Sequence, residues 1–198
     1  MNNKVKRDRW SRLLSRYQND PSVHQLIFVK YTGRRNAQVF LYQKSEKGWD
    51  CILSCPGHVG KEGIGKVREG DQKTPIGVYN LPGAFGIKDN PGTAMDYVKV
   101  TPFHYLCGDE HYYNQLIDIR EKPHDCQGEH LIDFVPHYNY GMFTDHNKEC
   151  VYGMGSAIFF HCFGLKPYTG GCVAVSEKDM IKILQNTEPG AKLCIYPM

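Results

Sequence analysis

Three apolar runs with turn signals between them occupy residues 25–54, and they constrain the fold of this chain more than any other feature. The runs cover 25–31, 37–43 and 49–54, and each is rich in β-branched and aromatic residues. Gly33 and the stretch 45–48 separate them. Short runs of this composition, bounded by turn residues, form strands rather than helices. The segment therefore predicts successive β-strands.

Similar short runs continue along the chain at 76–81, 97–101, 116–119 and 192–196. The proline- and glycine-rich stretch 83–92 is expected to be a loop. Residues 105–155 hold many Tyr, His and Asn residues and few aliphatic ones, a composition more typical of the wall of a binding cleft than of a packed core. Together these patterns predict a mostly β fold in a single domain.

Two amphipathic helices are expected at the two ends of this β region. Within 5–19, the residues Trp10, Leu13, Leu14 and Tyr17 have helical spacing, and Asp20-Pro21 ends the pattern. A second helix should begin at Ser176, which has capping-box spacing to Asp179. Its predicted buried side is Met180, Ile181 and Leu184, and 188–190 ends it. The expected organisation is an N-terminal helix in 1–22 appended to a domain over 23–198.

Size and charge exclude several classes of protein. The 198 residues suffice for a hydrophobic core, and the formal net charge of +3 gives no reason to expect a nucleic-acid partner. No apolar run approaches a membrane span. The basic first residues lack the apolar core of a secretory signal, so the sequence leaves cytoplasm and envelope both open. Gly60-x₄-Gly65-Lys66 falls short of a phosphate-binding loop, because Val67 replaces the Ser or Thr that would bind magnesium.

Eight cysteines are many for a chain of this length. Disulfides are one interpretation, and zinc is another, with Cys51-x₃-Cys55 and His124-x-Cys126 as loose fragments of a site. No second CxxC pair supports zinc. The favoured interpretation is scattered reduced thiols packed as small hydrophobic residues, with no metal and no cofactor.

The segment 155–175 contains the residues with the strongest chemical implication. An apolar run ends in His161, and the turn Thr169-Gly-Gly-Cys172 follows, with its cysteine eleven residues after the histidine. A thiol needs a base to act as a nucleophile at neutral pH. The glycines leave room for a substrate carbonyl and leave backbone N–H groups for a developing oxyanion. Strand periodicity places Phe159 and His161 on one face and Cys162 on the other.

In this order, the motifs resemble the L,D-transpeptidase catalytic domain, or YkuD-like, family, in its branch of small single-domain members. The matching positions are Gly70-Asp71 with Thr74-Pro75 and Gly77, Asp109 with Tyr113-Asn114, Leu131-Ile-Asp133 with Tyr138-Asn139, Gly155–His161, and Thr169–Ala174. They run from about residue 55 to 185. The fold that this resemblance implies is a β-sandwich or barrel with two or three helices, one of them N-terminal and one after the cysteine loop.

The resemblance makes Cys172 the nucleophile and His161 the residue that takes its proton. It implies a histidine oriented by a backbone carbonyl, and backbone N–H groups of Gly171 and Cys172 as oxyanion donors. The implied substrate is the stem tetrapeptide of peptidoglycan. Cys172 would form a thioester at the third residue and release D-Ala, and an amine would then complete a 3→3 cross-link or an exchange. Such chemistry belongs to the cell envelope, in the periplasm or at the extracellular face.

Two departures from better-known members leave the reaction outcome open. Gly170 stands where they carry a histidine, and Ala174 where they carry an arginine. We expect looser selection of the donor, with Lys166 as a candidate partner for its carboxylate. Residues expected to bind substrate are Thr169, Gly170, Tyr113, Asn114, Tyr138 and Asn139.

The alternative functions are an L,D-carboxypeptidase and an inactive envelope-binding module, although the presence of both His161 and Cys172 argues against the latter. A papain-like protease is excluded, because its cysteine precedes its histidine. A monomer is expected.

Overall fold

A computed structural model describes residues 9–197, and these residues form a mostly β fold, as the sequence predicts. The helices are α1 (Arg9–Gln18) and α2 (Glu177–Asn186), with two short 3₁₀ turns, η1 (Leu131–Asp133) and η2 (His137–Asn139). The strands are β1 (Gln25–Gly33), β2 (Asn36–Ser45), β3 (Gly48–His58), β4 (Gly77–Asn80), β5 (Ala84–Gly86), β6 (Tyr97–Lys99), β7 (His104–Cys107), β8 (Leu116–Asp118), β9 (Gly128–His130), β10 (Gly141–Phe143), β11 (Phe159–Cys162), β12 (Val173–Val175) and β13 (Lys192–Pro197). None of the helices in the described range is long and apolar enough to cross a bilayer.

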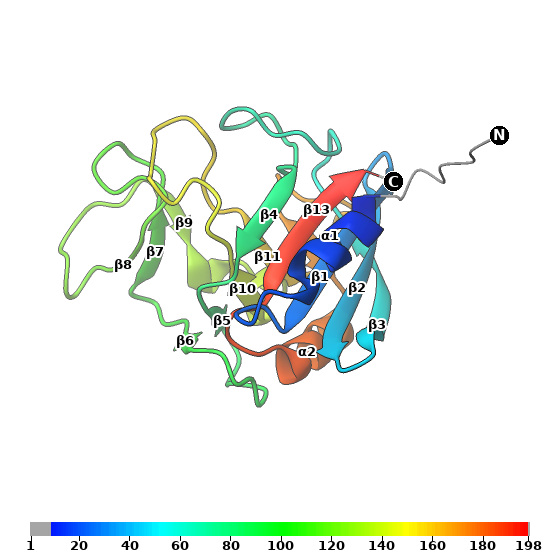
Figure 1. Cartoon of the computed structure of the whole chain (residues 1–198). Coiled ribbons are helices and arrows are strands. Elements are labelled where there is room, and N and C mark those ends of the chain that lie inside the picture. The colour runs from blue at the N-terminus through cyan, green and yellow to red at the C-terminus, as the bar shows by residue number, and fades with distance from the viewer. Residues whose placement is uncertain (1–8, 198) are drawn as a thin grey trace.

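Ten of the strands form one curled sheet in the order β4-β13-β1-β2-β3-β12-β11-β10-β5-β6 (Figure 1). The long hairpins of β1, β2 and β3 are antiparallel, and they arise from the three apolar runs of the sequence. Strand β12 joins this half to β11, which lies parallel to it. A second sheet of three strands, β8-β7-β9, stands apart on the left of Figure 1.

The main core fills the inside of the curl. It combines alternate side chains of the strands with the apolar face of α2, for example Val39 of β2, Phe160 of β11 and Ile183 of α2. Ser176 caps α2: its hydroxyl accepts from the Asp179 N–H at 3.1 Å and donates to the Asp179 carboxylate at 2.6 Å. Met180 and Leu184 are buried as predicted, whereas Ile181 is only partly buried.

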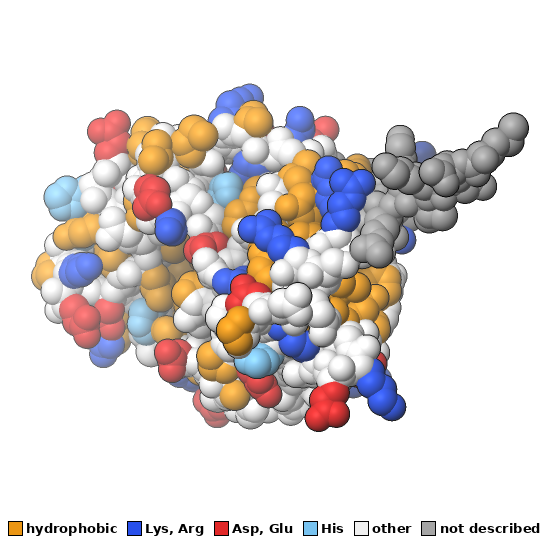
Figure 2. Space-filling view, viewed as in Figure 1, with side chains coloured by type: hydrophobic (Ala, Val, Ile, Leu, Met, Phe, Trp, Pro, Cys, Tyr) orange, Lys and Arg blue, Asp and Glu red, His pale blue; other side chains and the backbone are white. Residues whose placement is uncertain are grey.

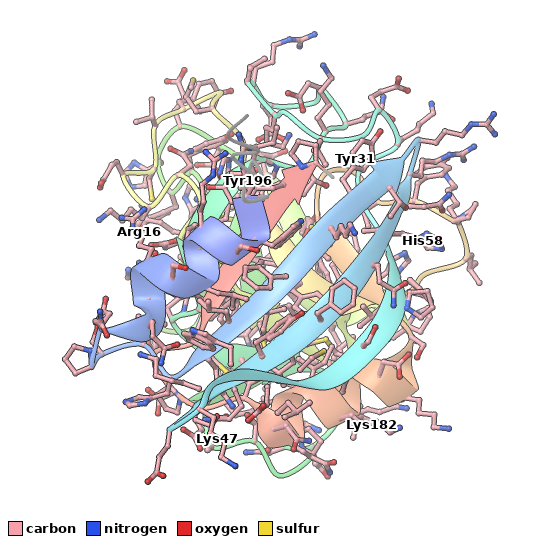
Figure 3. All side chains as sticks on the ribbon, turned by 45° about the vertical axis from the view of Figure 1, so that its right-hand side comes forward. Arg16, Tyr31, Lys47, His58, Lys182 and Tyr196 are labelled. Atoms are coloured by element: carbon pink, nitrogen blue, oxygen red, sulfur yellow. A yellow bond between two sulfur atoms is a disulfide. The ribbon has the colours of Figure 1, made fainter. Side chains whose placement is uncertain are left out.

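Helix α1 covers the outer face of the same sheet. Leu13 and Tyr17 pack with Leu26 and Phe28, the residues of β1 that point away from the main core. The helix predicted within 5–19 is present over Arg9–Gln18, and the part of that prediction before Arg9 lies outside the described residues. Lys and Arg side chains gather around this helix in Figure 2, and Arg16, labelled in Figure 3, lines a pocket with Asn80 of β4 and Lys192 of β13. With both faces covered, β1 is buried over most of its length.

A second apolar cluster lies between β11–β12 and the small sheet. It includes Phe85, Leu106, Leu131, Phe159 and Cys172. Because side chains alternate along β11, Phe160 and Cys162 enter the main core while Phe159 enters this cluster. The expectation of a loop over 83–92 is wrong for Ala84–Gly86, which form β5 between β10 and β6. Three residues are too few to show a strand period in the sequence.

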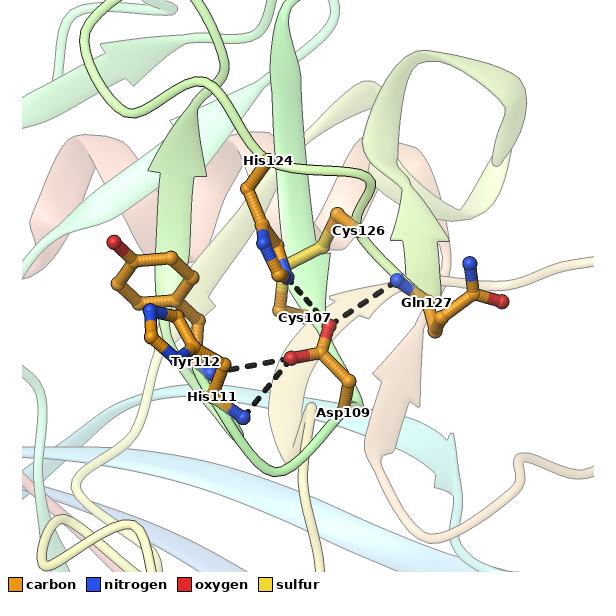
Figure 4. Close-up of a disulfide and its surroundings, with 7 residues drawn as sticks. All are labelled: Cys107, Asp109, His111, Tyr112, His124, Cys126 and Gln127. Atoms are coloured by element: carbon orange, nitrogen blue, oxygen red, sulfur yellow. Dashed lines mark hydrogen bonds and ion pairs between the residues drawn. A yellow bond between two sulfur atoms is a disulfide. The ribbon is translucent and has the colours of Figure 1, made fainter.

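The expectation that all cysteines are reduced is also wrong in the structure. Cys107 at the end of β7 forms a disulfide with Cys126, just before β9 (Figure 4). The remaining six cysteines are free. Asp109 lies beside this disulfide, where its carboxylate contacts His124 Nε2 at 3.0 Å and accepts backbone N–H groups, among them that of Gln127 at 3.2 Å. Cys107, Asp109 and His124 hold potential metal-ligand atoms within 4.8 Å of one another, but the sulfur of Cys107 is already bonded.

Candidate active site

Cys172 and His161 lie on adjacent parallel strands. Cys172 immediately precedes β12, in which Val173 pairs with Phe160 and Ala174 pairs with His161. This register places Cys172 beside Phe159. Since Phe159 and His161 point to the same face of β11, the thiol and the imidazole share the face that looks toward the small sheet.

The thiol of Cys172 is buried and has two backbone partners. Its Sγ donates to the carbonyl oxygen of Ala157 at 2.9 Å and accepts the N–H of Phe159 at 3.3 Å. Burial raises the pKa of the Cys172 thiol to about 12 despite the lowering effect of the Phe159 N–H. The resting residue is therefore a neutral thiol.

His161 is held as a neutral base. Only 4% of the residue is exposed, and Nδ1 lies 2.7 Å from the carbonyl oxygen of Cys162. A carbonyl can only accept, so Nδ1 bears the proton and Nε2 keeps a lone pair. Burial lowers the pKa of His161 to about 4. The ring of Tyr138 meets the imidazole edge-on, with centroids 5.5 Å apart, and the ring of His137 is 5.9 Å away.

Two threonine hydroxyls fix the backbone at Cys172. Thr74 Oγ1 donates to the Cys172 carbonyl oxygen at 3.0 Å and accepts the N–H of Gly60 at 2.8 Å. Thr169 Oγ1 donates to the same carbonyl at 2.7 Å. The Thr74-Pro75 motif, which alone indicates only a turn, thus joins a distant loop to the cysteine.

The adjoining Gly70-Asp71 motif holds a lysine under the cysteine loop. Asp71 accepts from Lys66 Nζ at 2.7 Å, and both side chains are nearly inaccessible, at 2% and 7% exposure. Burial alone would raise the pKa of Asp71, but the hydrogen bonds from Lys66 and from backbone N–H groups hold it well below the usual value. A Cβ on Gly171 would come within 3.0 Å of Lys66 Cε, and Gly171 has a φ of +154°. Both facts require glycine there.

Of the two expected oxyanion donors, the N–H of Gly171 already has a hydrogen-bond partner. The N–H of Gly171 donates to Thr169 Oγ1 at 3.1 Å. Gly171 can therefore serve a substrate oxygen only by exchanging this bond. Gly170 faces open space, since a Cβ there would meet no atom within 4 Å. The absence of a side chain at Gly170 widens the approach to the thiol.

A cavity of about 430 Å³ opens over Cys172. Its lining residues are Lys66, Glu69, Glu129, Phe134, His137, Tyr138, Ser156, Ala157, Ile158, Lys166, Tyr168, Thr169, Gly170, Gly171 and Cys172. Two carboxylates and two lysines thus line the same cavity as the thiol of Cys172. Sequence reasoning missed Lys66, Glu69, Glu129 and His137, because they come from separate segments with no shared motif. The buried Nδ1 of His137 has no hydrogen-bond partner among the described residues.

The residues predicted to bind substrate fall into three groups. Thr169, Gly170 and Tyr138 line the cavity, and Lys166 lines it from an exposed position. Tyr113 and Asn114 lie behind the lining: Tyr113 Oη donates to Glu69 at 2.5 Å, and Asn114 Oδ1 accepts the N–H of Ala157 at 3.1 Å. Asn139 is buried and donates to Glu177 at 2.7 Å, so it contacts α2 rather than the cavity.

A buried thiol that lines a cavity, with a neutral imidazole on the same face of the adjacent strand, is an arrangement that cysteine-dependent acyl-transfer and hydrolytic sites use. The model of the L,D-transpeptidase catalytic domain (YkuD) family matches residues 24–195. The chain belongs to this family.

Among solved structures, the chain is similar to Bd1075 of Bdellovibrio bacteriovorus, with 16% identity, a TM-score of 0.49, and coverage of 88% of this chain and 48% of that one. It is also similar to Pgp2 of Campylobacter jejuni, described as a helical cell shape determining protein, with 15% identity, a TM-score of 0.47, and coverage of 94% and 55%. The chain spans about half the length of each. No curated protein sequence matches it.

Proposed function

We propose that this protein transfers acyl groups on the stem tetrapeptides of peptidoglycan through a thioester at Cys172. The observation that carries the proposal is the state of the Cys172–His161 pair, a neutral thiol that lines a cavity and a neutral imidazole on the same strand face. Membership of the L,D-transpeptidase family supplies the substrate class.

In the first half-reaction, the Cys172 sulfur attacks the carbonyl between the third residue of the stem and D-Ala. The resting thiol is protonated, so His161 Nε2 takes its proton as the C–S bond forms. The tetrahedral intermediate then collapses, and the imidazolium returns the proton to the leaving amine of D-Ala. The Nδ1–H bond to the Cys162 carbonyl keeps the correct tautomer throughout and stabilises the transient imidazolium.

The oxyanion of the tetrahedral intermediate needs donors close to the sulfur. We assign this role to the N–H groups of Cys172 and Gly171, the latter after releasing Thr169 Oγ1. Thr74 and Thr169 hold the backbone on the C-terminal side of the Cys172 N–H, because both bind the Cys172 carbonyl oxygen. The cavity residues Thr169, Gly170 and Tyr138 contact the stem peptide, and Lys166 faces its carboxylate end.

The thioester can react in two ways. Attack by an amine gives a 3→3 cross-link or a D-amino-acid exchange, and attack by water gives L,D-carboxypeptidase activity. Gly170 and Ala174 favour a substantial share of hydrolysis, because the donor carboxylate would meet the flexible Lys166 instead of a planar guanidinium, while Lys66 is paired with Asp71. Such a reaction places the protein in the cell envelope.

Mass spectrometry of the products from a defined tetrapeptide, with and without an acceptor amine, tests the proposal. We expect release of D-Ala, a cross-linked product when amine is present, and some tripeptide in both cases. A carbapenem should acylate Cys172. A protein that neither releases D-Ala nor reacts with a carbapenem would be a binding module, and the proposal would be rejected.

A further inference from the structure

We propose that the Glu129 carboxylate is the proton acceptor for the amine that attacks the thioester, with Tyr138 as its positioning residue. This inference rests on the proposed function and assigns a separate base to its second half-reaction. An amine acceptor arrives as an ammonium ion at neutral pH, and it must lose a proton before it can attack.

Glu129 shares a cavity with the thiol that would carry the acyl group. It lies on β9 of the small sheet and lines the same cavity as Cys172, which immediately precedes β12 of the large sheet. Its Oε2 accepts the hydroxyl of Tyr138 at 2.5 Å. Tyr138 is 3% exposed, and its ring contacts His161 edge-on, so one residue fixes both the carboxylate and the imidazole.

Glu69, the other carboxylate of the cavity, is fully engaged in structural bonds. Its Oε2 accepts from Tyr113 Oη, from Ser156 N–H at 2.7 Å and from Ser156 Oγ at 2.9 Å. Burial alone would raise the pKa of Glu69, but these bonds outweigh it and lower the pKa. A carboxylate held ionised by three donors is a poor base.

The surroundings of Glu129 shift its pKa upward, the opposite direction from the shift at Glu69. Burial raises its pKa to about 7 even though the Tyr138 hydroxyl opposes the shift, and the negative charge of Glu69 adds to the rise. Besides Glu69, the other titratable groups that line the cavity are Lys66, His137, Tyr138, Lys166, Tyr168 and Cys172. Of these, His137 and Cys172 are neutral near pH 7, since burial lowers the pKa of the former and raises that of the latter. A carboxyl group that titrates near neutral pH can both accept a proton and release it to water.

In the proposed step the acceptor ammonium loses two protons in turn. The ammonium passes one proton to Glu129, and the neutral amine attacks the thioester carbonyl. The new C–N bond forms, the C–S bond breaks, and the second amine proton reaches the Cys172 sulfur through His161. The products are an amide, a free thiol and one proton, which Glu129 returns to solvent.

The test compares two acceptors in wild type and Glu129→Gln, with rates normalised to acylation of Cys172. One acceptor is a lysine-type side-chain amine, and the other is hydroxylamine, which is largely neutral at pH 7. Glutamine keeps an oxygen for the Tyr138 hydroxyl but cannot take a proton. We expect transfer to the side-chain amine to fall by about 10²–10⁴-fold, with a much smaller fall for hydroxylamine.

A Tyr138→Phe variant provides an independent readout. It removes the hydrogen bond that lowers the pKa of Glu129, so the inflection of the amine-transfer profile should move to higher pH. Equal losses with both acceptors in Glu129→Gln, or an unmoved inflection in Tyr138→Phe, would overturn the assignment of Glu129 and leave thioester formation intact. Failure of wild type to acylate at all would instead reject the proposed function, and with it this inference.

Discussion

The thiol of Cys172 donates a hydrogen bond to the carbonyl oxygen of Ala157, 2.9 Å away, and Ala157 itself occupies the left-handed region with a φ of +53°. That conformation is unusual for a residue other than glycine. The Asn114 side chain maintains it by accepting the Ala157 N–H and donating to the carbonyls of His146 and Asn147. Asn114 thus influences the Cys172 thiol indirectly, because it holds the backbone at Ala157, whose carbonyl oxygen accepts the hydrogen bond of the thiol.

We therefore expect Asn114→Ala to slow acylation of Cys172 and to lower the free energy of unfolding by about 1–3 kcal/mol, because buried backbone groups lose their partners. Carbapenem labelling followed by mass spectrometry measures the first effect, and denaturant unfolding the second. Asn147→Ala is a matched control: Asn147 also has a positive φ and two carbonyl partners, but it does not bond Ala157. Equal acylation rates in the two variants would contradict the role of Asn114.

Cys172→Ala and His161→Ala should each abolish turnover while the fold is retained. Since thiol and base act as a unit, either loss should cost on the order of 10³–10⁶ in rate. Cys162→Ala is the control, because Cys162 is buried on the opposite face of β11 and its Sγ bonds the Tyr140 carbonyl. D-Ala release measures the effect, and substantial activity in Cys172→Ala would remove it as the nucleophile.

Thr74→Val should lower both stability and activity. The change leaves the Gly60 N–H without its acceptor and removes one of the two hydroxyls on the Cys172 carbonyl, so we expect a loss of about 1–3 kcal/mol in the free energy of unfolding. Thr74→Ser keeps the hydroxyl and should retain most activity. If the valine and serine variants behave alike in denaturant unfolding and kcat/KM, the hydroxyl is unimportant.

Acid should destabilise the protein through His161. Its folded-state pKa of about 4 lies below the usual 6.5, so between these values the unfolded chain binds a proton that the folded chain does not. The stability is fully present above pH 6.5 and falls by up to about 3 kcal/mol as the pH drops to 4. Glu129, with its raised pKa, acts in the opposite direction, so the measurement is the difference in unfolding free energy between wild type and His161→Gln across this range. A difference independent of pH would contradict the assignment.

Lys166→Ala tests the proposed contact with the donor carboxylate. Lys166 lines the cavity but is exposed, and its Nζ lies 5.9 Å from the centre of the Tyr168 ring, so we expect only a several-fold fall in kcat/KM for tetrapeptide donors. Lys61→Ala, a change of another exposed lysine that does not line the cavity, is the control. Unchanged kinetics would remove Lys166 from the site.

Sequence patterns predicted those helices and strands whose structure is determined by residues close to one another in the chain. The runs that became β1, β2 and β3 are long enough to show strand character, and Ser176 caps α2 through a residue only three positions away. Three-residue strands such as β5 and β12 are held by pairing with distant segments and leave no period to detect. The carboxylates of the cavity could not be predicted for a similar reason: Glu129 of the small sheet and Glu69 of the long segment between β3 and β4 reach the cavity of Cys172 only in the folded chain.

Thr74 and Cys172 are separated by 98 positions in the chain, yet a single hydroxyl joins them. Contacts of such sequence separation form late in folding, because loop closure must be achieved before they can stabilise anything. The peptide group of the cysteine is therefore fixed only when the rest of the domain is already in place. A newly made or partly unfolded chain would hold a thiol without these partners, so we expect acylation of Cys172 by a carbapenem to require completed folding.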